Sequence, residues 1–221
     1  MPATLSAVEE APARAGIVPS TPTVNDLAIR VGTVNGSGSQ SANLVILRAL
    51  YAMGIPCSGK NVFPSNIEGL PTWFHIRASG SGYVGHVLDP QVLVCMNEQT
   101  GKDDALALKP GAICIYRDDF DQDLRSLRND VHFFPVPFQK LVEKAYPPDK
   151  ADKSYKEKLR KVINMVYVGV VASVCRIEFG AVEEGIRREF PGRKAKAGEV
   201  NINAARTGFE WAAANLPADL P

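Results

Sequence analysis

The sequence predicts an α/β fold with a mostly parallel, mixed sheet. From residue 27 onward, short β-rich runs alternate with amphipathic helical segments, which is the pattern of a layered α/β domain. A glycine- and serine-rich loop joins the first predicted strand to the first predicted helix, and a Ser-Gly-Ser-Gly turn at residues 79–82 predicts a β-hairpin. Together these observations predict a three-layer, Rossmann-like α/β domain.

The predicted elements follow one another closely along the chain. The first unit is a strand at 27–33, the glycine loop and a helix at 40–53, which Gly54 ends as a C-terminal cap. A short extended segment follows at 56–63, and the hairpin pairs 71–78 with 83–87. Later strands are predicted at 91–96, 112–116 and 131–136, and later helices at 97–108, 137–146, 158–175, 177–190 and 198–216.

Composition favours a single core. The chain has 221 residues, of which 45% are hydrophobic and 22% charged, so it can bury a substantial core. Its formal net charge of +1 lacks the strong basic excess of nucleic-acid-binding proteins, and we expect no nucleic-acid partner. We divide the chain into an extended, proline-rich N-terminal arm at residues 1–24 and an α/β domain at residues 25–221.

No segment is predicted to enter a membrane. The most apolar stretch, residues 162–175, is interrupted by Asn164 and is shorter than the roughly 20 residues that a membrane-spanning helix needs. We interpret it as a buried helix. The first 23 residues carry two glutamates and no apolar run, so no secretory signal is predicted and a cytoplasmic location is expected.

The chain is not expected to hold a metal or a redox centre. Its cysteines are widely separated and lack the Cys-x-x-Cys spacing of zinc and iron–sulfur sites. We expect buried, reduced thiols at Cys57, Cys95, Cys114 and Cys175. The three histidines lie on predicted strands without a nucleophile motif, so we interpret them as structural and predict no catalytic residue.

The loop at residues 34–41 is the strongest candidate for a binding site. Backbone N–H groups of such a loop and the following helix N-terminus converge on one point, which favours a phosphate or a carboxylate. Glycines also serve tight turns and close helix–sheet packing, so a structural role stays open. Lys60, in a polar segment, is either a solvated surface lysine or a cation directed at an anionic ligand.

Two nucleotide-binding interpretations fit less well. A dinucleotide-binding fold places an acidic residue about 20 positions after its glycines, whereas residues 54–62 contain none. Residues 54–60 match the start of a phosphate-binding P-loop, but Asn61 stands where serine or threonine would bind magnesium. An independent nucleotide-dependent oxidoreductase is therefore the weakest hypothesis.

Three sequence blocks, at 33–43, 53–61 and 63–73, carry a resemblance to a known family. In this order they resemble the gamma subunit or gamma domain of 2-oxoacid:acceptor oxidoreductases, and most closely the 2-oxoglutarate:ferredoxin type. The resemblance covers about residues 25–216. Many members have Gly-Gly-Gln-Gly in the first loop, whereas this chain has Gly-Ser-Gly-Ser-Gln, which leaves the identity of the 2-oxoacid open.

The resemblance implies an accessory subunit that is inactive alone. The enzyme would oxidatively decarboxylate a 2-oxoacid with coenzyme A to an acyl-CoA and CO₂, and would pass electrons to ferredoxin or a similar acceptor. Thiamine diphosphate, Mg²⁺ and [4Fe-4S] clusters would lie in partners, namely thiamine-binding alpha and beta subunits and an iron–sulfur, delta-type subunit. The alternative is a non-catalytic scaffold or binding subunit of such a complex.

The resemblance also implies which residues form a coenzyme A or substrate pocket beside the thiamine site. These residues come from the glycine loop, the lysine of the second block and the polar positions of the third. An ammonium group that is partly shielded from water gains more from a nearby anion than one in bulk water, which supports including the lysine. The predicted site residues are Asn35, Gly36, Ser37, Gly38, Ser39, Gln40, Lys60, Ser65, Asn66 and Thr72.

Overall fold

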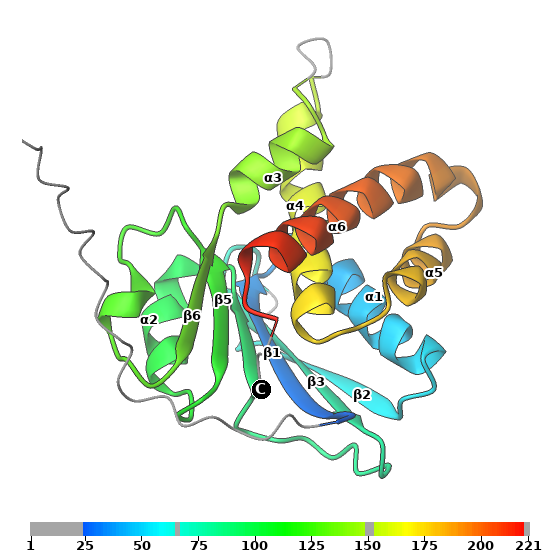
Figure 1. Cartoon of the computed structure of the whole chain (residues 1–221). Helices are drawn as coiled ribbons and strands as arrows, with labels where there is room; N and C mark the ends of the chain where they lie inside the picture. The colour runs from blue at the N-terminus through cyan, green and yellow to red at the C-terminus, as the bar shows by residue number, and fades with distance from the viewer. Residues whose placement is uncertain (1–23, 65–66, 149–152, 219–221) are drawn as a thin grey trace, which may run out of the picture.

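The fold was derived from a computed structural model, which describes residues 24–64, 67–148 and 153–218 (Figure 1). The predicted N-terminal arm therefore lies outside the described residues, except for its last residue, Val24. Ser65 and Asn66 of the predicted site also lie outside them.

Six strands form one mixed sheet in the order β2-β3-β1-β4-β5-β6. Strands β1, β4, β5 and β6 are parallel to one another, whereas β3 is antiparallel to both β1 and β2. The sheet is thus mostly parallel and mixed, as predicted. The strands are β1 Asp26–Val34, β2 Cys57–Val62, β3 Pro71–Ser79, β4 Val92–Cys95, β5 Ile113–Arg117 and β6 His132–Val136.

Helices lie on both faces of the sheet and complete the three predicted layers (Figure 1). Helix α2 covers one face, while α1 and α4 cover the other and are joined there by α3, α5 and α6. The α-helices are α1 Ser39–Ala52, α2 Glu98–Leu106, α3 Phe138–Ala145, α4 Tyr155–Val174, α5 Phe179–Glu189 and α6 Ala195–Asn215, and two short 3₁₀ turns are η1 Leu124–Ser126 and η2 Gly192–Lys194.

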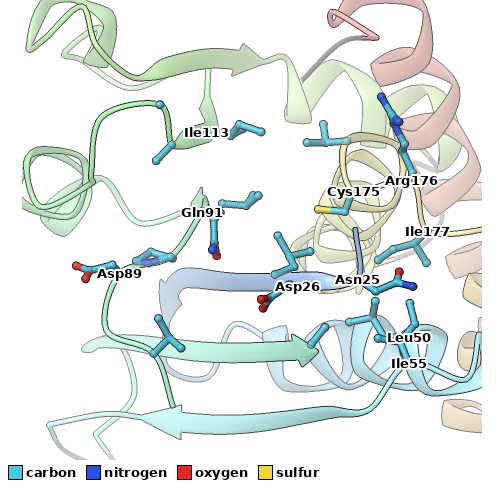
Figure 2. A pocket seen from close by; sticks show the side chains of 18 of the residues that line it. Asn25, Asp26, Leu50, Ile55, Asp89, Gln91, Ile113, Cys175, Arg176 and Ile177 are labelled. Carbon is cyan, nitrogen blue, oxygen red and sulfur yellow. The ribbon is translucent and has the colours of Figure 1, made fainter. Parts of the chain in front are cut away.

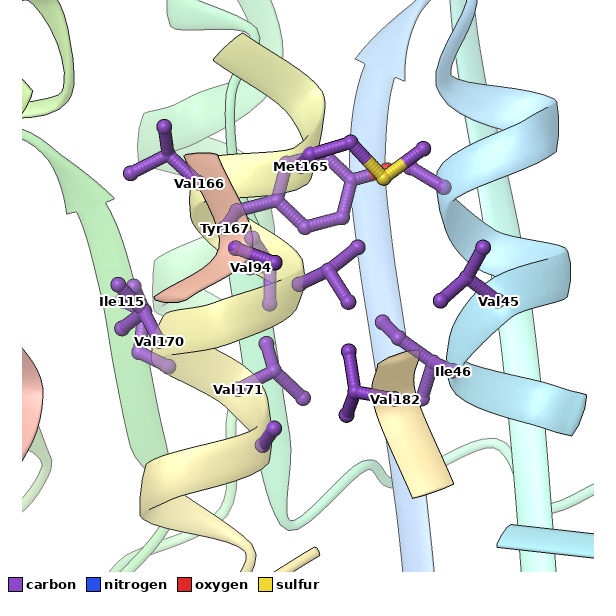
Figure 3. Packing of buried hydrophobic residues seen from close by; sticks show 14 of the residues in the cluster. Val45, Ile46, Val94, Ile115, Met165, Val166, Tyr167, Val170, Val171 and Val182 are labelled. Carbon is purple, nitrogen blue, oxygen red and sulfur yellow. The ribbon is translucent and has the colours of Figure 1, made fainter. Parts of the chain in front are cut away.

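Strand β4 is apolar throughout because both of its faces are buried. In β4, Val92 and Val94 join the larger core cluster with α1 and α4, while Leu93 and Cys95 join the smaller cluster on the α2 face. Side chains of a strand point alternately to opposite faces, so one four-residue run supplies both clusters. Figure 3 shows the larger cluster, in which side chains of α1, α4 and α5 meet those of β4 and β5.

The apolar stretch predicted as a buried helix is the inner part of α4. Ten of its residues between Val162 and Ala172 are buried, and α4 makes its most extensive helix contact with α6. Two glycines permit this contact: a Cβ at Gly169 would lie 1.8 Å from the Ala205 oxygen, and one at Gly208 would lie 2.2 Å from the Val166 oxygen. The helices therefore touch through their backbones.

The predicted hairpin partner of β3 is wrong. Residues 83–87 form no strand, and the antiparallel neighbour of β3 on its outer side is β2, with Lys60 opposite His75. A strand has two hydrogen-bonding edges, and β1 and β2 occupy both edges of β3. The segment after the Ser-Gly turn instead lies against β2, where the Ser58 hydroxyl donates to the Val84 carbonyl at 2.6 Å. The extended segment predicted at 56–63 is the strand β2.

Candidate anion-binding site

The glycine loop has the conformation that its sequence favours. Gly36 and Gly38 have φ values of 84° and 81°, in the left-handed region that residues with a side chain rarely adopt. Gly38 is the N-cap of α1, which has no side-chain cap and no acidic residue in its first turn. The backbone N–H groups at the start of α1 are therefore free of a side-chain acceptor and can receive an anion.

Residues of helix α4 contact the glycine loop and the start of α1. The Asn164 side-chain amide donates to the Ser37 carbonyl at 2.8 Å, and the Tyr167 hydroxyl lies 3.0 Å from Asn43 Oδ1 at the first turns of α1. The Lys161 side chain packs beside Gly38, because a Cβ there would lie 3.3 Å from Lys161 Cγ. Sequence reasoning noted Asn164 only as an interruption of an apolar run, although a buried polar side chain needs a partner and so signals a specific contact.

The structure brings the first and third sequence blocks together. The Asn35 N–H donates to the Leu70 carbonyl at 2.8 Å, and the Gly69 N–H donates to the Asn35 carbonyl at 3.0 Å. The Asn35 side chain adds a bond to the Ile67 carbonyl at 3.0 Å. The Glu68 side chain lies over Gly36, where a Cβ would be 2.7 Å from Glu68 Cγ. A carboxylate thus rests on the glycine loop.

The hydroxyl groups around the loop differ in whether they have a hydrogen-bond partner. Thr33 and Ser39 share a hydrogen bond at 2.9 Å, and the buried Thr72 hydroxyl lies 3.2 Å from Asn61 Oδ1. Because it is buried, the Thr72 side chain can position its neighbours but cannot contact a ligand directly. The Ser37 hydroxyl is shielded from water and has no hydrogen-bond partner among the described residues. Such an unsatisfied group costs about 1–3 kcal/mol, which a ligand can recover.

Lys60 lies on a different part of the surface. It faces His75 across the β2–β3 pair, and His75 faces Arg30 across the β3–β1 pair. Four residues along β1 and two strand spacings across the sheet separate Lys60 from Val34, which corresponds to about 16 Å. The structure therefore does not bring Lys60 and the glycine loop together. A single ligand touching both has to extend along the sheet.

The surroundings of Lys60 are strongly positive. Burial, together with the nearby Arg30, His86 and Lys60, lowers the pKa of His75 from 6.5 to about 4. The rings of His75 and His86 meet edge to face, with centroids 4.6 Å apart. His75 is consequently neutral at neutral pH, and the positive charge of this face comes from the arginine and the lysine.

The cysteines do not gather into a site. Cys95 and Cys114 are buried, Cys57 and Cys175 are half-buried, and all four are free thiols. Burial raises the pKa of Cys95 to about 12, which keeps it protonated. Within residues 24–64, 67–148 and 153–218, no three His, Cys, Asp or Glu side chains are grouped as a metal site would require.

A large cavity opens at the end of the sheet where the parallel strands begin, whereas the glycine loop follows the other end of β1. It has a volume of about 520 Å³ and lies where β1, β4 and β5 begin (Figure 2). Leu50, Ile55 and Ile177 form part of its apolar wall, and Asp26 and Arg176 lie at its border. None of the eight predicted site residues that the structure describes lines it.

Comparison with known proteins identifies the family. Residues 28–211 match the sequence model of the pyruvate ferredoxin/flavodoxin oxidoreductase family. The chain belongs to this family. The resemblance carried by the three sequence blocks is thereby confirmed. None of the curated proteins compared with the chain is significantly similar to it in sequence.

Solved structures of this kind of enzyme share the fold. The 2-oxoglutarate:ferredoxin oxidoreductase from Magnetococcus marinus, with 2-oxoglutarate, coenzyme A and succinyl-CoA bound, is 23% identical with a TM-score of 0.74. The match covers 89% of this chain but 32% of that one, so the present chain spans about a third of its length.

Two smaller proteins match over nearly their whole length. A pyruvate oxidoreductase subunit from Thermotoga maritima is 19% identical with a TM-score of 0.63, over 85% of this chain and 97% of that one. The gamma subunit of a keto/oxoacid ferredoxin oxidoreductase from Geobacter sulfurreducens is 16% identical with a TM-score of 0.66, over 85% and 99%. The α/β fold predicted from the sequence is the fold of these family proteins.

In the part of the chain that the structure describes, no helix is both long enough and apolar enough to cross a bilayer.

Proposed function

We propose that this chain is the gamma subunit of a multi-subunit 2-oxoacid:acceptor oxidoreductase. The complex oxidatively decarboxylates a 2-oxoacid with coenzyme A, yields an acyl-CoA and CO₂, and passes electrons to ferredoxin or a similar acceptor. The observation that carries the proposal is the family match over residues 28–211. The near-complete coverage of two separate subunits of such enzymes supports the gamma-subunit assignment.

The glycine loop is the part of the chain that we assign to the pocket for coenzyme A or for the substrate carboxylate. Uncapped N–H groups at the start of α1 and the unsatisfied Ser37 hydroxyl favour an anionic group there. The loop backbone is held by α4 and by residues 67–70, so it is ordered before a ligand arrives. The entering anion takes the space of the Glu68 side chain, which has to rotate away from Gly36.

The remaining chemistry is assigned to partner subunits. Thiamine diphosphate with Mg²⁺ and the [4Fe-4S] clusters need carboxylate or thiolate ligand sets, and the described residues offer no such group. The thiamine-binding alpha and beta subunits, the delta-type subunit and a cytoplasmic location are part of the same proposal.

The substitution Ser37→Ala tests the role of the loop in the assembled complex. Because the hydroxyl has no partner in the free chain, its removal should leave the thermal midpoint unchanged or slightly raised. If it binds the ligand, the KM for coenzyme A or for the 2-oxoacid should rise about fivefold, the equivalent of about 1 kcal/mol. The assay is coenzyme A-dependent reduction of ferredoxin.

Ser126→Ala is the matched control, because this serine lies in η1 and its hydroxyl donates to the Asp123 carbonyl. Its KM values should equal those of the parent complex. A scaffold subunit is the alternative, and the carboxylate of Glu68 lying on Gly36 is the observation that favours it. Unchanged KM values in Ser37→Ala, with full assembly, would establish scaffolding and overturn the pocket role.

A further inference from the structure

One face of the sheet carries a row of basic side chains across three strands. Arg30 of β1, His75 of β3 and Lys60 of β2 stand directly opposite one another in the strand register. They point away from the larger core cluster, which receives the alternate residues of the same strands, such as Ile29 and Ile76. Lys60 and His86, which lies next to His75, are exposed.

The acidic side chains near this row already have ion-pair or hydrogen-bond partners. Asp26 pairs with Arg77, Asp89 pairs with Lys109, and the buried Asp104 accepts the indole N–H of Trp73 at 2.9 Å. Neither cation of the row has an ion-pair partner in the described part of the chain; the arginine instead donates to the Leu88 carbonyl at 2.6 Å. Two uncompensated positive charges therefore flank His75.

Such a row weakens the free protein. Arg30 and Lys60 carry like charges about 10 Å apart with no acidic side chain between them in the strand register, and burial leaves Arg30 Nε and Arg77 Nε without a hydrogen-bond partner among the described residues. Beside the row, Ser58, Lys60, His75 and His86 border a small hollow of about 20 Å³, large enough for one water-sized group. Both the charge and the unsatisfied donors would be relieved by an anion.

We propose that Arg30, His75 and Lys60 bind a phosphate group, either a phosphomonoester dianion or a diphosphate. The row spans two strand spacings, about 10 Å, so an anion centred over His75 lies within reach of both flanking cations. A dianion neutralises both charges at once, whereas a single carboxylate of an acidic protein surface neutralises one. The neutral imidazole of His75 adds an N–H donor without adding charge.

Two sources could supply the phosphate: a free phosphate or diphosphate, and the phosphates of coenzyme A. The inference rests on the proposed function only in naming coenzyme A as one source. If the phosphate site and the proposed function are both right, coenzyme A lies along the face of the sheet that carries this row. Its phosphates are then at the row, and its other end is nearer the glycine loop. The phosphate site itself needs no partner subunit and can be tested on the isolated chain.

The test is a histidine NMR titration with pyrophosphate, coenzyme A and pantetheine, which lacks phosphate. The chain has three histidines, so assignment needs only His75→Gln and His86→Gln. Pyrophosphate should shift the His75 and His86 signals and raise the pKa of His75, since a nearby dianion stabilises the imidazolium. His132, on β6 at the far edge of the sheet, should not respond and serves as the internal control.

Variants make the test specific. Lys60→Gln and Arg30→Gln should each weaken pyrophosphate binding by about fivefold to tenfold, as expected for the loss of a charge-assisted contact. Lys196→Gln removes the same charge from α6, on the other side of the sheet, and should change binding little. Pyrophosphate binding without coenzyme A binding would retain the site and refute only the coenzyme A source.

Three results would overturn the proposal. One is the absence of any His75 response to pyrophosphate in the millimolar range, and another is equal weakening by Lys60→Gln and Lys196→Gln, which indicates diffuse attraction. The third is salt-sensitive assembly with partner subunits that Lys60→Gln abolishes while pyrophosphate has no effect. That outcome would assign the row to an acidic protein surface.

Discussion

Replacing Gly169 with alanine should severely destabilise the domain. The added Cβ would lie 1.8 Å from the Ala205 oxygen, whereas real Cβ contacts shorter than 3.0 Å essentially do not occur. Helix α6 would have to retreat by more than 1 Å along a contact that also depends on Gly208. Overpacking of this kind costs about 3 kcal/mol or more, and the better helix propensity of alanine returns about 1 kcal/mol.

The net loss of about 2 kcal/mol or more is large against a typical domain stability of 5–15 kcal/mol. Urea unfolding followed by circular dichroism measures it as a lowered midpoint at an unchanged slope. The control is Gly180→Ala on α5, where a Cβ meets nothing within 4 Å, so stability should stay the same or rise slightly. Equal stability of the two variants would refute the close backbone contact.

Two further predictions concern pH and thiol chemistry. The pKa of His75 is about 4 in the folded chain and 6.5 in the unfolded chain, so between these pH values the unfolded chain binds more protons. The urea midpoint should therefore fall as the pH drops from about 6.5 to about 4. His75→Gln should reduce this dependence of the midpoint on pH. A slope unchanged by the substitution would contradict this. Burial raises the pKa of Cys95 to about 12, so iodoacetamide at pH 8 should modify this buried thiol only after unfolding in urea, as read by mass spectrometry; its rapid modification in the folded chain would contradict this prediction.

Most of the fold could be predicted because local patterns and tertiary packing agree. Strand β4 and the inner part of helix α4 consist mostly of apolar residues, which predicts that they are buried, and Gly54 marks the end of the first helix. The partner of β3 could not be predicted, because strand pairing is a non-local choice between β2 and the residues after the turn. The segment 56–63 was predicted as extended, but its polar residues Lys60 and Asn61, which are typical of an exposed edge strand, gave no indication of its partner.

The site was predictable only in part. The glycine loop is a local feature, and its conformation follows from Gly36 and Gly38. Its supports are not local: Asn164 reaches the loop from α4, more than a hundred residues later in the chain. The row of Arg30, His75 and Lys60 depends on the register of three strands, so no sequence spacing reveals it.

Native mass spectrometry tests the central claim most directly. The chain is produced together with the thiamine-binding and iron–sulfur subunits, purified through its own tag, and weighed intact. We predict an assembly that contains the 23.9 kDa chain together with those subunits and shows coenzyme A-dependent 2-oxoacid oxidation. Recovery of the chain only alone, or only as multiples of its own mass, would contradict its assignment as a gamma subunit.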